Sequence, residues 1–171
     1  HWGRIRLVRN QVSQNGLASI PALMRIDNRR ALQVESYAWL WALAKFLDAH
    51  PRYQERWQSL VSQVNQSDFD DIFENGFAED QLQLEKEWRW YQKNLEYGHD
   101  ISREAIDFVP GVPIREGDVP LSIAADRGWQ SSRVLVEKGK RYRVDARGEF
   151  VVGKESDGRE GVSEANGISL S

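Results

Sequence analysis

The spacing of hydrophobic positions divides the chain into a helical first part and a strand-rich second part. Residues 1–108 place apolar side chains three and four residues apart, as helices do, whereas residues 119–171 form short alternating runs separated by charged or glycine turns. Residues 109–118 hold two prolines and two glycines, which is typical of a linker or a stiff extended crossing. The pattern predicts an α+β protein: a helical bundle followed by a small antiparallel β-sandwich-like module.

The helix expected from Leu32 to Ala49 is the most apolar element of the first part. Its middle is apolar on nearly every side, which predicts a buried central helix. Its first turn carries Glu35 and Tyr37, and His50 follows the helix directly before Pro51. These polar side chains either form an active site or have structural roles. In the structural interpretation, the helix dipole favours the carboxylate of Glu35, and His50 is a polar residue at a helix junction. We favour the structural interpretation.

Capping residues and apolar stripes place the other helices. Ser19 precedes Pro21 at the start of one helix, Ser67 begins another that Gly76 ends, and Asp80 caps a further one. The expected apolar stripes are Tyr53, Trp57, Leu60, Val61 and Val64, then Phe69, Ile72 and Phe73, then Leu84, Trp88, Tyr91 and Leu95.

The second part contains short runs that alternate as strands do. In "RYRVDAR", Tyr142, Val144 and Ala146 face one way and the charged residues the other, as in an antiparallel sheet with one wet face. A module of residues 119–171 is small for independent stability, and the chain stops within another strand-like run. We therefore expect either that this sheet docks on the helices or that the module is incomplete.

The net charge of −3 is distributed unevenly. Residues 1–30 hold six Arg and one Asp, whereas residues 31–108 hold seven basic and fifteen acidic residues. Because the basic stretch is short and adjoins an acidic body, we expect mutual contact between them and no nucleic-acid partner. No run approaches the ~20 apolar residues that a membrane span needs, so we expect none.

Candidate catalytic and metal-binding motifs are absent from the sequence. The histidines are His1, His50 and His99, each far from the next, and cysteine does not occur. Neither H-E-x-x-H, G-x-S-x-G nor a phosphate-binding glycine loop is found. Acidic pairs such as those in "DFDD" and "EKE" are typical of solvated helix faces. We therefore expect no catalytic residue and no metal ligand within this chain.

Two stretches of the first part carry a family resemblance. "ESYAWLWALAKFLDAHPRY" and "FAEDQLQLEKEWRWYQKNLEYGHDI" resemble the C-terminal part of a gluzincin-type metallopeptidase-like family, frequent in planctomycete bacteria and largely of unknown function. That family carries H-E-x-x-H and a third glutamate ligand in a W-x-x-E-G-x-A-E-Y type motif. The resemblance implies that zinc would be held upstream of His1, by a catalytic-like region of the same protein that is this chain's partner. It also implies a secreted or periplasmic location.

A stretch of the second part carries another resemblance. "IAADRGWQSSRVLVEKGKRYRVDARGEFVV" is similar to the opening strands of bacterial calcium-dependent galactose-binding lectin-like β-sandwiches. The shared residues are Gly128, Trp129, Gln130, Gly139, Ala146 and Gly148. The resemblance implies a carbohydrate site with Trp129, Gln130 and Asn166. The matching loop, Ser163 to Gly167, offers few of the ~6–8 oxygens that calcium takes, so we do not expect calcium.

These observations lead to one main expectation and two alternatives for function. The main one is a non-catalytic C-terminal portion of an exported metallopeptidase-like protein: helical domain 1–108, linker 109–118 and accessory β-sandwich-like module 119–171. The alternatives are a carbohydrate-binding, lectin-like module on a helical scaffold, and a structural interaction protein.

Overall fold

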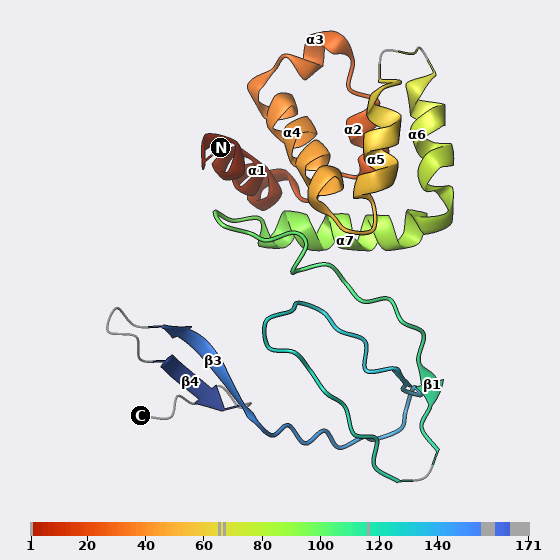
Figure 1. Ribbon diagram of the computed structural model, residues 1–171. Coiled ribbons are helices and arrows are strands. Elements are labelled where there is room, and N and C mark those ends of the chain that lie inside the picture. The colour runs from red at the N-terminus through yellow and green to blue at the C-terminus, as the bar shows by residue number, and fades with distance from the viewer. Residues whose placement is uncertain (1, 65, 67, 116, 155–159, 165–171) are drawn as a thin grey trace. The chain divides into compact units, whose positions relative to one another are not determined.

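The computed structural model describes residues 2–64, 66, 68–115, 117–154 and 160–164 (Figure 1). It divides into two compact units. The helical unit comprises His1–Phe108 and Arg127–Gln130, and the second unit comprises Val109–Asp126 and Ser131–Ser171. Four residues that follow the expected linker therefore pack with the helices.

Helix α7 of the helical unit crosses below the other helices of that unit in Figure 1. The α-helices of this unit are α1 (Trp2–Asn15), α2 (Ile20–Met24), α3 (Asn28–Ala31), α4 (Val34–Ala49), α5 (Gln54–Val61), α6 (Phe69–Phe77) and α7 (Gln81–Asn94), with the 3-10 turn η1 (Ala78–Asp80) before α7. The expected stripe of α7, Leu84, Trp88, Tyr91 and Leu95, is buried. Helical periodicity thus located the core face of α7 correctly.

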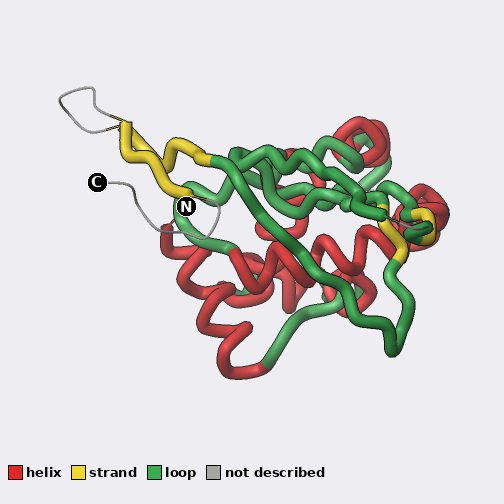
Figure 2. Tube along the Cα trace, turned by 90° about the horizontal axis from the view of Figure 1, so that it is seen from below, coloured by secondary structure: helices red, strands yellow, loops and turns green. Residues whose placement is uncertain are grey.

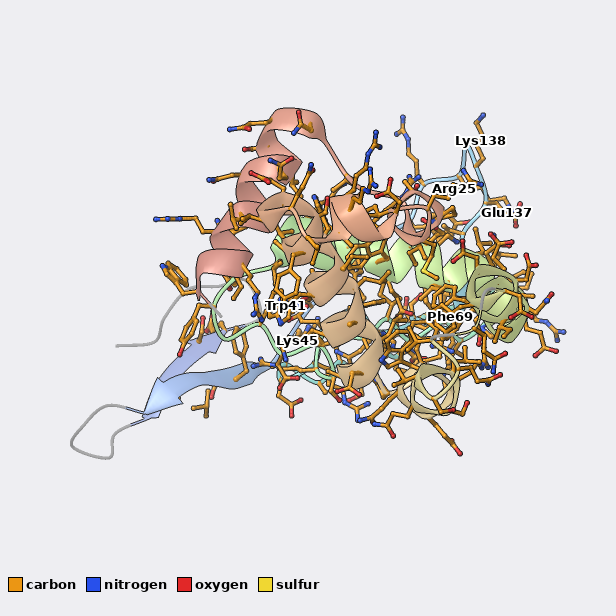
Figure 3. All side chains as sticks on the ribbon, turned by 90° about the horizontal axis from the view of Figure 1, so that it is seen from above. Arg25, Trp41, Lys45, Phe69, Glu137 and Lys138 are labelled. Atoms are coloured by element: carbon orange, nitrogen blue, oxygen red, sulfur yellow. The ribbon has the colours of Figure 1, made fainter. Side chains whose placement is uncertain are left out.

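The core of the helical unit is rich in aromatic rings. Phe46 of α4 packs against Trp88 and Tyr91 of α7, with ring centroids 5.6 and 5.2 Å away. The expected burial of α4 is confirmed for one face only, since Tyr37 is 50% exposed and Trp41 is partly buried. Arg4 of α1 lies over both rings, and Figure 3 shows Trp41 on the side of α4 toward α1. The Trp41 side of α4 therefore packs partly on the core and is covered partly by a guanidinium.

The expected helix boundaries hold in part. Ser19 caps α2, accepting a hydrogen bond from the amide of Ala22. Gly76 does not end α6 but lies inside it, where a Cβ would meet the Leu60 side chain at 2.9 Å. Asp80 stands at the start of α7 without a capping hydrogen bond, because its carboxylate pairs with an arginine of α5. The expected cap Ser67 lies outside the described residues.

The second unit contains two small sheets. Strands β1 (Val112–Pro113) and β2 (Val134–Leu135) pair in parallel, and β3 (Glu149–Lys154) and β4 (Glu160–Glu164) pair antiparallel. The β1 pairing requires glycine at position 111, since a Cβ there would lie 2.7 Å from the Val134 carbonyl carbon. Strand β1 falls within the stretch expected to be a linker.

The sandwich expected for this unit is not shown by the described residues. Figure 2 draws most of residues 109–148 as loop, and the segment around Tyr142 and Val144 forms no strand. The expected apolar face is not buried there, since Val144 is 88% exposed. An apolar strand face needs a second layer to cover it, and the described residues supply none here.

Candidate functional site

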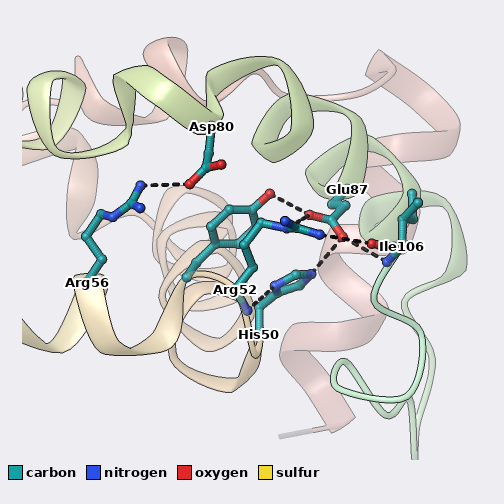
Figure 4. Close-up of polar contacts among 7 residues, drawn as sticks. His50, Arg52, Arg56, Asp80, Glu87 and Ile106 are labelled. Carbon is teal, nitrogen blue, oxygen red and sulfur yellow. Dashed lines mark hydrogen bonds and ion pairs between the residues drawn. The ribbon is translucent and has the colours of Figure 1, made fainter. Parts of the chain in front are cut away.

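The buried carboxylate of Glu87 is the centre of the main polar cluster in the helical unit (Figure 4). Glu87 lies on α7, three residues after Leu84, so it shares the core-facing side of that helix and is 3% exposed. Its Oε1 accepts a hydrogen bond from the amide of Ile106 at 2.8 Å. Its Oε2 accepts the hydroxyl proton of Tyr53. A buried carboxylate with several donors satisfies the requirement that buried charges be paired.

His50 approaches the same carboxylate from the end of α4. It has left helical geometry, with φ −83° and ψ 123°, as expected for a residue before proline. Its Nδ1 accepts the amide proton of Arg52 at 3.2 Å, so the ring proton is on Nε2, which lies 3.0 Å from Glu87 Oε1. The Nε2 proton is not well aligned with that oxygen, so the contact is a close electrostatic one rather than a good hydrogen bond.

Tyr53 and Arg52 complete the cluster from the turn before α5. The Tyr53 ring is fully buried and stacks on the His50 ring, with centroids 4.4 Å apart. The Arg52 Nε lies 3.8 Å from Glu87 Oε2, and its Nη2 donates to the Ile106 carbonyl at 3.2 Å. The cluster thus joins the α4–α5 turn, α7 and the segment that follows α7.

The surroundings shift the ionisation of both acids. Burial alone would raise the pKa of Glu87, but the contacts from His50 and Tyr53 and the Ile106 amide outweigh it, and the pKa lies below its usual value. Burial, with the hydrogen bond to Glu87 and its charge, raises the pKa of Tyr53 far above its usual value. The cluster therefore keeps Glu87 ionised and Tyr53 protonated near neutral pH.

This arrangement holds a charge rather than transferring a proton. A general base must have a free lone pair within reach of a substrate. The carboxylate of Glu87 is enclosed by protein donors, and both His50 and Tyr53 are buried. The neighbouring pair of Arg56 and Asp80, at 2.9 Å, lies nearer the surface and joins α5 to the start of α7.

The candidate residues on α4 do not form one site. Glu35 is exposed in the first turn, and Tyr37 accepts a hydrogen bond from Arg4 Nη2 at 3.3 Å. His50 lies at the other end of the helix, in the Glu87 cluster. The sequence-based view of His50 as only a junction residue is therefore incomplete, because the ring is 2% exposed and paired.

The candidate carbohydrate residues lie partly in the helical unit. The Trp129 ring packs edge-on against Trp90 of α7, with centroids 5.4 Å apart, yet is 56% exposed. The Trp129 carbonyl accepts the amide proton of Asp107, and the Gly128 amide donates to the Arg103 carbonyl. Gln130 is partly buried and adjoins this loop, whereas Asn166 lies outside the described residues. The loop of residues 127–130 is thus fastened to the segment after α7.

Glu87 itself was missed by the sequence analysis, which treated "EKE" as a solvated face. Its spacing held the signal: Glu87 is three residues after Leu84 and four before Tyr91, on the buried stripe. A carboxylate on such a stripe must find partners in the core. The sequence did not indicate that those partners would come from the "HPRY" turn.

No family model, no curated protein and no solved structure matches the chain. Across the part of the chain that the structure describes, no three potential metal-ligating side chains gather at one place. The described helices also include none that is long and apolar enough to span a bilayer.

Proposed function

We propose that the chain is a non-catalytic part of an exported metallopeptidase-like protein, with the helical unit as a scaffold and the second unit as an accessory module of sandwich type. The observation that supports this is the state of Glu87. Its oxygens are engaged by Tyr53 and Ile106, and its side chain is 3% exposed. The buried carboxylate of Glu87 is thus occupied by contacts within the helical unit.

The support is energetic as well as geometric. Leaving a buried charge unpaired costs several kcal/mol, roughly 3–5 when one partner of a buried pair is removed. The contacts of Glu87 therefore hold together the α4–α5 turn, α7 and the segment around Ile106, which a scaffold requires.

The test measures zinc content, peptide cleavage and stability for the parent chain and for Glu87→Gln. The purified chain should bind no zinc stoichiometrically and cleave no peptide, and Glu87→Gln should change only its stability. Elemental analysis after dialysis and a peptide-cleavage assay measure the first two, and thermal unfolding measures the third. One zinc per chain, or peptide cleavage that Glu87→Gln abolishes in folded protein, would contradict the proposal.

A second candidate function, carbohydrate binding, is favoured by the exposure of Trp129. An aromatic ring fixed at its edge by Trp90 and open on the remainder can stack against a sugar. Trp129→Ala should then abolish binding in a galactoside titration, while Trp2→Ala, which removes a tryptophan of similar exposure, should leave it unchanged. If galactosides bind neither variant nor the parent chain, with or without calcium, this candidate is excluded.

A further inference from the structure

Helix α1 presents an outer stripe of positive charge and an exposed indole. Trp2, Arg6 and Arg9 are exposed and lie four and three residues apart, so they follow one another on the same side of the helix. No acidic residue occurs in α1, while Ile5 and Val8 face the core. The exposed rings of Trp2 and Tyr97 pack edge to face, with centroids 5.8 Å apart, and extend the apolar part of this surface.

Helix α6 presents the opposite charge in matching spacing. Asp70, Asp71 and Glu74 are exposed, with the two aspartates four and three residues before the glutamate, while Phe73 and Phe77 face the core. Neighbouring like charges at this spacing weaken a helix by about 0.2–0.5 kcal/mol per pair. Val64, in the segment before α6, is also exposed. The charges of the two stripes are therefore complementary.

The two stripes do not neutralise each other within one molecule. Helices α1 and α6 lie at opposite sides of the helical unit, with α4 and α5 between them (Figure 1). The described ion pairs of this unit join Arg30 to Asp27, Arg52 and His50 to Glu87, and Arg56 to Asp80. The mutual contact expected from the charge pattern is thus not seen as ion pairs between these two helices.

From this separation we infer that the α1 stripe is a docking surface for the α6 stripe of a second copy of this chain. Arg6 and Arg9 match the spacing of Asp71 and Glu74, so two ion pairs form side by side across the contact. Because the two surfaces differ and lie at opposite sides, the contact is head-to-tail and adds copies in a row. Its strength depends on salt, because exposed charges are screened beyond ~10 Å at 0.1 M.

The experiment uses neutral substitutions so that no new attraction is created. Sedimentation of the full chain should give a mass above the 19.7 kDa monomer that rises with concentration at ~20 mM salt and returns to the monomer at ~0.5 M. The double variants Arg6→Gln with Arg9→Gln, and Asp71→Asn with Glu74→Gln, should each be monomeric. In a mixture of the two, the first variant keeps an intact α6 stripe and the second an intact α1 stripe. The mixture should therefore form a 1:1 dimer and nothing larger.

A matched control separates the stripe from net charge. Arg103→Gln with Arg127→Gln removes the same charge from exposed positions elsewhere in the helical unit and should associate like the parent chain. A parent chain that stays monomeric at low salt overturns the inference and leaves the α1 stripe to an acidic partner of another kind. Association that survives either double variant, or a mixture that exceeds a dimer, overturns it as well.

Discussion

Two buried tyrosines should differ in how much stability they lose when the hydroxyl oxygen is removed. Tyr53 and Tyr91 are both within 3% of complete burial, and both pack on Phe46. The Tyr53 hydroxyl donates to the carboxylate of Glu87, whereas the Tyr91 hydroxyl has no hydrogen-bond partner among the described residues. Substitution by phenylalanine removes the same atom in both cases, so the difference reports on the hydrogen bond.

The expected magnitudes follow from the partners. A hydrogen bond to a charged group contributes ~1.5–3 kcal/mol, so Tyr53→Phe should lower the free energy of unfolding by ~2 kcal/mol. A buried polar group without a partner costs ~1–3 kcal/mol, and removal of a hydroxyl also leaves a small void. Tyr91→Phe should therefore leave the free energy of unfolding unchanged or raise it by up to ~1 kcal/mol.

Urea unfolding followed by tryptophan fluorescence measures both changes. With a denaturant dependence of ~1–3 kcal/mol per M, Tyr53→Phe should move the midpoint down by ~1 M. Tyr37→Phe is the control, since the Tyr37 hydroxyl is at an exposed site and its loss should matter by less than ~0.5 kcal/mol. Equal midpoint shifts in the same direction for Tyr53→Phe and Tyr91→Phe would refute a stabilising hydrogen bond from Tyr53 to Glu87.

Three further predictions concern other parts of the helical unit. Folding lowers the pKa of the Glu87 carboxyl below its usual value of 4.5. Its contribution to stability is therefore present above pH 4.5 and is lost as the pH falls through the lower folded pKa. In Glu87→Gln the melting temperature should therefore fall less on acidification than it does in the parent chain. Gly128→Ala should lower the free energy of unfolding in urea by ~1–3 kcal/mol, because its Cβ would lie 2.9 Å from the Glu104 Cα. Gly3→Ala, whose Cβ would meet open space on α1, should raise the free energy of unfolding by up to ~1 kcal/mol. Trp41→Ala should cost less than the ~3–5 kcal/mol of a fully buried tryptophan in the same assay, since Trp41 is only partly buried.

The sequence predicted those elements whose signals are local. Ser19 caps its helix because a serine side chain can reach the first free amides of a helix. His50 leaves helical geometry because proline follows it, and the Leu84–Leu95 stripe is buried because of its period. In each case the cause lies within a few residues of the effect, so a pattern in one sequence is sufficient.

Features that depend on distant partners could not be predicted in the same way. Glu87 and Tyr53 are 34 residues apart in the chain, and nothing local to either indicates their hydrogen bond. The expectation for residues 141–147 was wrong in a related way: the alternation is present, but pairing needs a neighbouring strand, and Val144 stays exposed. An amphipathic pattern indicates that a segment has an apolar face to bury, but it does not identify the element that packs against that face.

We expect the Glu87 cluster to contribute more to the specificity of the fold than to its net stability. Replacing a whole buried ionic cluster by apolar residues is often neutral or stabilising, whereas breaking it at one member is costly. The triple variant His50→Leu, Tyr53→Phe and Glu87→Leu should therefore unfold at a higher urea midpoint than Glu87→Leu alone, which leaves His50 and Tyr53 buried without their partner. The Ile106 amide, however, loses its acceptor in this variant, so its hydrogen exchange should become much faster than in the parent. If the exchange of Ile106 is unchanged, the carboxylate is not what fastens the segment after α7, and packing around that segment suffices.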